Sequence, residues 1–152
     1  KVSFIVSNAV GGEPVDLTAP YTADGALTDP DVSSGAEYKT VVSYNDQNQF
    51  MGDVPWTVSW LGNSNEDALL EEGEKAEISV WLLIRDTTQA ISSGTATSYW
   101  TADSNGANGI LSSGTILEKN DKFSLTLSPP DGATLNIERN LPPRLDAIMD
   151  LK

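Results

Sequence analysis

The sequence predicts an all-β protein, an antiparallel β-sandwich or barrel. Three observations predict it: apolar and polar residues alternate in several short segments, polar turn residues separate these segments, and almost no stretch has helical spacing. A period of two places apolar side chains on one face of a strand and polar ones on the other. Because buried parallel strands show continuous apolar runs, the alternation favours antiparallel sheets with one solvated face.

The first forty residues predict two short strands and a long loop. Lys1–Ser7 alternates apolar residues with serines, which is the pattern of a first strand. Gly11–Pro14 breaks it, and Val15–Leu17 is a short second piece. Residues 19–36 are rich in Ala, Pro, Asp, Gly and Ser, so we expect a polar loop there.

The middle of the chain predicts two further strands. Tyr38–Tyr44 has a strand pattern and is followed by a turn at Asn45–Asn48. Tryptophan and valine alternate with threonine and serine in Trp56–Trp60, which predicts the next strand. Residues 63–74 form a polar, acidic connection, with one helical turn expected around Ala68–Leu70.

Ala76–Arg85 gives the clearest strand pattern. One predicted face carries Ile78, Val80, Leu82 and Ile84, and the other carries Glu77, Ser79, Trp81, Leu83 and Arg85. Residues 86–115 are mostly small and polar, so we expect a long excursion with one short strand near 97–101.

The last quarter of the chain predicts a β-hairpin. Apolar residues alternate in Phe123–Leu127 and again in Leu135–Ile137, on both sides of Pro129–Gly132. In that turn Pro130 presets φ and Gly132 releases the chain into the next strand, which is typical of a type I turn.

Composition and charge limit the function. A chain of 152 residues predicts one domain over residues 1–152, large enough for a real core. Nine Lys and Arg against 22 Asp and Glu give a net charge of −13, which repels nucleic acid and anionic membrane surfaces. No run of apolar residues is long enough to span a bilayer.

The residue types also argue against an enzyme. The chain has no Cys and no His, which excludes Ser-His and Cys-His nucleophiles and thiolate metal sites. No glycine-rich phosphate loop lies between a strand and a helix, and 22 acids make any one carboxylate pair uninformative. We therefore expect no catalytic residues and no organic cofactor.

A divalent cation such as Ca²⁺ fits the acidic loops better. Asp103, Asn105 and Asn108 place oxygen ligands beside glycines, in partial resemblance to a calcium loop, although the usual twelfth-position Glu is missing. Asn45–Asn48 is a second candidate loop. The alternative for both is a solvated, Asx-rich turn.

The tryptophans divide into two groups. Trp56 and Trp60 share one strand face, so we expect them in the core. Trp81 and Leu83 lie opposite the clean apolar face of their strand. That second apolar face is either buried between two layers or forms an interface with a partner.

Several short segments occur in an order that resembles one protein family, the archaellins, which are the subunits of the archaeal flagellum filament. These segments are Gly11–Leu17, Leu69–Glu74, Ile78–Val80, Leu117–Phe123, Leu125–Leu127, Pro129–Ala133, Leu135–Arg139, Pro142–Pro143 and Ile148–Leu151. The resemblance covers most of the chain except the loops 19–36 and 86–115, where surface loops tolerate change.

The resemblance implies an extracellular structural protein that serves swimming motility. Archaellins have an N-terminal hydrophobic helix that builds the filament core and an immunoglobulin-like outer domain, in which metal binding is reported. This chain begins at Lys1 in strand pattern, so we expect it to be the outer domain alone. Its partners would be other archaellin copies in a helical filament, joined by contacts that do not close.

An extracellular binding module is the alternative function, since fold alone does not separate an adhesin, a carbohydrate-binding domain or a surface-layer domain from a filament shell. A carbohydrate-binding module needs exposed aromatic rings, and Tyr99 and Trp100 are the candidates that the sequence offers.

Overall fold

The computed structural model describes most of the chain, and every structural statement below refers to that part: residues 1–9, 11–25, 30–32, 37–65, 67–82, 84–85, 100–101, 117–146 and 148–151. Within these ranges the regular structure consists of strands that pair in antiparallel fashion. These described residues form no α-helix. This confirms the predicted all-β, antiparallel fold. The described residues contain no membrane-spanning helix.

The first of two main sheets has three strands in the order β1-β9-β7. Its strands are β1 (Val2–Ser7), β9 (Lys75–Val80) and β7 (Trp56–Leu61). The register aligns Phe4 with Ile78 and Ile78 with Val58. The strand predicted from Lys1–Ser7 is confirmed, and its side chains alternate between half-buried and exposed.

The second main sheet has four strands in the order β13-β12-β5-β6. Its strands are β13 (Leu135–Asn140), β12 (Lys122–Ser128), β5 (Val41–Asp46) and β6 (Phe50–Met51). The predicted terminal hairpin is confirmed, since Leu125 pairs with Ile137 and Leu127 with Leu135. Gly132 in its turn has φ +99, a conformation that side chains disfavour.

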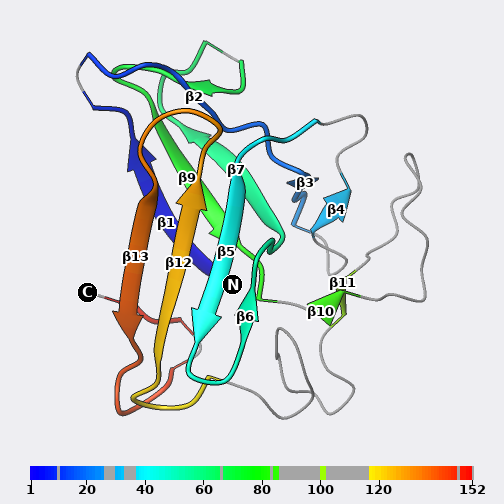
Figure 1. Ribbon diagram of the computed structural model, residues 1–152, viewed down its shortest axis with the longest axis vertical. Helices are drawn as coiled ribbons and strands as arrows, with labels where there is room; N and C mark the ends of the chain where they lie inside the picture. Colours follow the sequence, from blue (N-terminus) through cyan, green and yellow to red (C-terminus); the bar gives the residue numbers. More distant parts are fainter. Residues whose placement is uncertain are drawn as a thin grey trace.

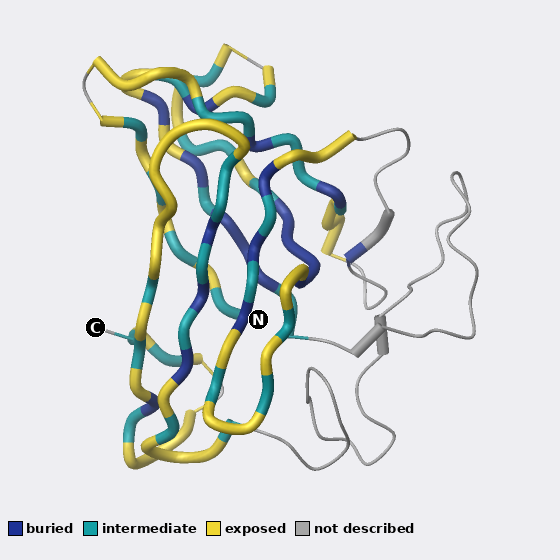
Figure 2. Tube along the Cα trace, viewed as in Figure 1, coloured by how far each residue is buried: buried dark blue, intermediate teal, exposed yellow. Residues whose placement is uncertain are grey.

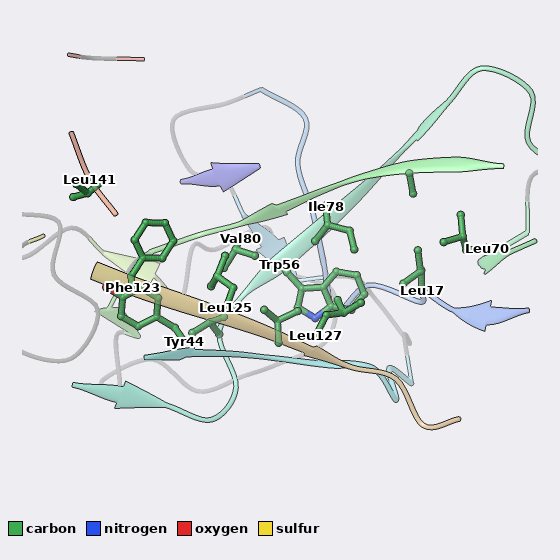
Figure 3. Packing of buried hydrophobic residues seen from close by; sticks show 13 residues of the cluster. Leu17, Tyr44, Trp56, Leu70, Ile78, Val80, Phe123, Leu125, Leu127 and Leu141 are labelled. Atoms are coloured by element: carbon green, nitrogen blue, oxygen red, sulfur yellow. The ribbon is translucent and has the colours of Figure 1, made fainter. Parts of the chain in front are cut away.

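The two sheets pack face to face as a sandwich, the second in front of the first in Figure 1. Buried residues alternate with intermediate ones along β12, as Figure 2 shows. Figure 3 shows the core between the sheets. Its members are Leu17, Val42, Tyr44, Val54, Trp56, Leu70, Ala76, Ile78, Val80, Phe123, Leu125, Leu127 and Leu141. Trp56 is fully buried and Trp60 packs against this cluster, as predicted.

The helical turn expected around Ala68–Leu70 is wrong, because this segment is extended. Leu69–Leu70 forms β8, which pairs with β2 (Val15–Asp16). The Asp67 carboxylate accepts the Leu69 N–H at 2.8 Å, a local bond that competes with helix formation. Leu70 is then buried at the end of the core together with Leu17.

The loop predicted for residues 19–36 also contains regular structure. Tyr21–Thr22 forms β3 and Asp31–Val32 forms β4, and the two pair in antiparallel fashion. Strands of two residues are too short to show an alternating pattern in the sequence.

The strand predicted over Ala76–Arg85 is too long, because β9 ends at Val80. The Trp81 N–H donates to the Pro55 carbonyl at 2.9 Å, but Pro55 has no N–H to donate in return, so the ladder stops. Further along the chain, β10 (Ile84–Arg85) pairs with β11 (Trp100–Thr101) in a separate sheet. The short strand expected near 97–101 is thus confirmed at residues 100–101.

Candidate functional site

The first predicted cation loop is not part of the described structure. Asp103, Asn105 and Asn108 lie outside the described residues, so their role as ligands stays a prediction. Within the described residues, no group of three or more acidic side chains is arranged to hold a metal ion.

The second candidate loop, Asn45–Asn48, is organised by hydrogen bonds to the Asp46 carboxylate. Asp46 Oδ1 accepts the backbone N–H of Asn48 at 2.7 Å and of Gln49 at 2.9 Å. Its Oδ2 accepts the Tyr44 hydroxyl at 2.7 Å and the Gln49 side-chain amide at 2.8 Å. Both oxygens are therefore occupied by protein donors, which favours an Asx turn over a cation site.

These bonds also change acid–base behaviour. Burial alone would raise the pKa of the Asp46 carboxyl, but the bonds from Tyr44, Gln49 and Asn48 outweigh it, so the pKa lies below its ordinary value. For the partner, burial and the hydrogen bond to Asp46 raise the pKa of Tyr44. A charged Asp46 carboxylate and a neutral Tyr44 phenol are thus joined by a hydrogen bond that stabilises the turn.

The acidic connection over residues 63–74 is used in the same way. The Glu74 carboxylate is buried and accepts the N–H of Asn65 at 3.1 Å and of Glu71 at 3.0 Å. The Asn65 amide donates to Asp67 at 3.0 Å and to Glu71 at 2.9 Å. These acids satisfy backbone and amide donors of a tight turn, which is a structural role.

Trp81 lies on the outer face of the first sheet. Its indole Nε1 donates to Thr57 Oγ1 at 3.2 Å, and the Lys1 ammonium sits 4.9 Å from the centre of its ring. The side chain is half-buried, so it covers its own sheet and still presents surface. Leu83, its predicted companion, lies outside the described residues, and an interface at Trp81 stays a prediction.

The residues beneath Trp81 form a row of hydroxyl groups. The register aligns Ser3 with Ser79 and Ser79 with Thr57 on the outward side of the sheet. Ser3 Oγ and Ser79 Oγ are 2.8 Å apart, and both Ser79 and Thr57 are buried. The next outward row contains Ile5, which is 64% exposed.

The second sheet has a contrasting outward row that runs across all four strands. The register aligns Glu138 with Ser124, Ser124 with Asn45, and Asn45 with Phe50. Phe50 is 63% exposed, although the sequence pointed to Tyr99 and Trp100 as the exposed aromatic residues. Tyr99 lies outside the described residues, and Phe50 was missed because a two-residue strand gives no facing pattern.

The described part of the chain is thus an antiparallel β-sandwich in which buried polar groups fasten turns and sheet faces. No family model matches the chain. It is 30% identical over 151 residues to a curated protein of Archaeoglobus fulgidus called Probable flagellin 1, a match that includes 99% of this chain. The chain is therefore related to the archaellins, as its segments predicted. It spans 60% of the length of that relative.

Proposed function

We propose that the chain is the outer, immunoglobulin-like domain of an archaellum filament subunit, which forms the filament shell and serves swimming motility. The observation that carries this proposal is the 30% identity along 99% of the chain to a protein named as a flagellin. The use of Asp46 and Glu74 as internal acceptors supports a structural, non-catalytic role. In this proposal the protein is extracellular and its partners are further copies of itself.

Deletion and complementation of the gene in its host would test the proposal. Cells that lack the gene should lose filaments in electron micrographs and swimming in soft agar, and complementation should restore both. Mass spectrometry of purified filaments should find peptides of this chain. Filaments that never contain the chain would contradict the proposal.

The contact between neighbouring copies is proposed to include Trp81 and Leu83. A net charge of −13 on every copy makes contacts repulsive unless they are apolar, charge-complementary or bridged by cations. Trp81 is a half-buried aromatic side chain whose indole N–H is already bonded, so its remaining surface can be covered without leaving a donor unpaired. Trp81→Ala should then weaken filaments, whereas Phe50→Ala, on the other outer face, should not.

We also propose that Asp103, Asn105 and Asn108 bind a divalent cation in the filament. Calcium at a hundred times its Kd would stabilise the fold by about 2.7 kcal/mol through mass action. We expect millimolar calcium to raise the melting temperature of the chain, and Asp103→Asn to abolish the rise. An unchanged melting temperature would refute the site, and a rise that Asp103→Asn retains would locate the cation elsewhere.

A further inference from the structure

We propose that the outer face of the second sheet binds sugar rings of a polysaccharide. The site is the cross-strand row Glu138, Ser124, Asn45 and Phe50, together with the hollow that the first three of these residues help to line. This binding activity does not depend on the filament role proposed above.

An open hollow lies on this part of the surface. Its volume is about 320 Å³, and its lining consists of Asn45, Asp46, Gln47, Lys122, Phe123, Ser124 and Glu138. The lining residues come from β5, the turn after it, β12 and β13, so the hollow follows the sheet across its strands. An open surface suits a polymer that passes over it, whereas small ligands usually sit in enclosed pockets.

The polar side chains of the hollow match the chemistry of sugar hydroxyls, which both donate and accept hydrogen bonds. Asn45 and Gln47 offer amide donors and acceptors, and Ser124 offers a hydroxyl. Among the described residues, no hydrogen bond engages these three side chains, so they remain available to a ligand.

A charged pair contributes to the lining of the hollow. Lys122 Nζ lies 2.7 Å from Glu138 Oε1, and both side chains are more than half exposed. The pair supplies a charge-assisted acceptor and a charge-assisted donor next to the neutral amides and hydroxyl. The charges of Lys122 and Glu138 offset each other, and the Asp46 carboxylate in the same lining adds negative charge, so the hollow favours a neutral, hydroxyl-rich ligand over a strong anion.

Phe50 supplies the apolar contact that a sugar ring needs. It follows Asn45 in the outward row, and its ring is 63% exposed. The face of an aromatic ring carries partial negative charge, which attracts the weakly positive C–H groups on the flat face of a sugar. Gly52 lies next to this ring, since a Cβ added to Gly52 would come within 3.7 Å of Phe50 Cε1.

Other ligand classes fit this surface less well. Nucleic acid is repelled by the net charge of −13. An apolar ligand would leave the amide, hydroxyl and carboxylate groups without partners, at a cost of about 1–3 kcal/mol for each buried group. An added β-strand would pair at a sheet edge, whereas Ser124 and Asn45 lie on the two central strands.

The proposal is tested by titrating the full 152-residue chain, labelled with ¹⁵N, with oligosaccharides. The probes are β-1,4-linked glucose and N-acetylglucosamine oligomers and α-1,6-linked mannose oligomers, each from one to six rings. At least one series should shift the amide signals of Asn45 and Ser124 with a millimolar Kd that tightens with length. Absence of shifts at these residues with all three series at tens of millimolar would overturn the proposal.

Matched variants distinguish a specific site from nonspecific binding to the protein surface. Phe50→Ala should weaken binding about tenfold, equivalent to about 1.4 kcal/mol, and Asn45→Ala should act in the same direction. Ile5→Ala is the control, because Ile5 is 64% exposed on the opposite sheet. Because all three substituted side chains are exposed, each variant should keep the NMR spectrum of the folded chain apart from local shifts. Equal affinities of Phe50→Ala and Ile5→Ala for the binding oligomer would contradict the assignment.

Discussion

On the first sheet, one outward row consists of the small hydroxyl side chains Ser3, Ser79 and Thr57, the last bonded to Trp81, whereas on the second sheet the row through Ser124 and Asn45 meets water. Ser79 and Thr57 are buried on what would ordinarily be a solvated face. Ser124 and Asn45, the corresponding residues of the second sheet, are half-buried and exposed. On the first sheet Trp81 thus lies on the outer face and bonds to Thr57, whereas the corresponding row of the second sheet is left to solvent.

The comparison predicts first that the two sheets differ in their outer faces while sharing one core. Ile78→Ala in the first sheet and Leu125→Ala in the second should each lower the free energy of unfolding by about 2–5 kcal/mol. Urea unfolding measures both, with Ile5→Ala as the exposed control, expected within about 0.5 kcal/mol of the parent. A small change in the free energy of unfolding at either position would mean that the sheet carrying it does not depend on the shared core.

A second, smaller effect is expected at the turn that closes the second sheet. Asp46→Ala removes the acceptor for Tyr44, Asn48 and Gln49, and should cost about 1–3 kcal/mol in urea unfolding. Because the folded pKa of Asp46 is lowered, its contribution is complete above the unfolded value of about 3.9 and is lost as pH falls through the folded pKa.

The matched control for this turn is Asp131→Ala, which changes an exposed carboxylate in the hairpin turn. It should leave the stability at neutral pH nearly unchanged. If the two substitutions had the same effect, the bonds to Asp46 would have no special role.

The third prediction concerns the cover on the first sheet. Trp81→Phe keeps an aromatic ring but removes the bond to Thr57, and should cost about 0.5–1.5 kcal/mol. A double-mutant cycle with Thr57→Val isolates this pair, and its coupling should be nonzero. Additive effects of the two substitutions would mean that Trp81 covers the face without bonding to it.

The smallest effect is expected beside β5, where the Tyr38 hydroxyl donates to Asp53 at 2.9 Å. Burial and this bond raise the pKa of Tyr38 to about 12. Its contribution to stability is therefore present below the unfolded value of about 10 and is lost as pH rises through the folded pKa. Ultraviolet titration should show late ionisation that Asp53→Asn shifts toward pH 10, whereas an unshifted curve would assign the delay to burial alone.

The sequence predicted the parts of the fold that depend on periodicity. Phe123–Leu127 and Lys1–Ser7 alternate long enough to define a strand and its buried face, and both strands are found. The errors occur where a segment elsewhere in the chain determines whether a strand forms or where it ends. Leu69–Leu70 is a strand because it pairs with β2, and β9 ends at Val80 because Pro55 lies opposite the next residue.

The candidate site was less predictable for the same reason. Thr57 and Trp81 are 24 positions apart, and their contact follows from the register of β7 on β9. The row from Glu138 to Phe50 likewise requires three registers at once. Asp46 was identified as a possible ligand from its residue type, but its hydrogen-bond partners depend on the folded shape of the turn.

The buried Glu74 carboxylate has a consequence for the behaviour of the protein in salt. High ionic strength screens charges that face water, with a Debye length of about 3 Å at 1 M, but it acts little on carboxylates that are bonded to backbone N–H groups inside a turn. Glu74 and Asp46 are of this second kind. In concentrated brine the surface repulsion between copies would fade, whereas the turns that these two acids hold would keep their shape.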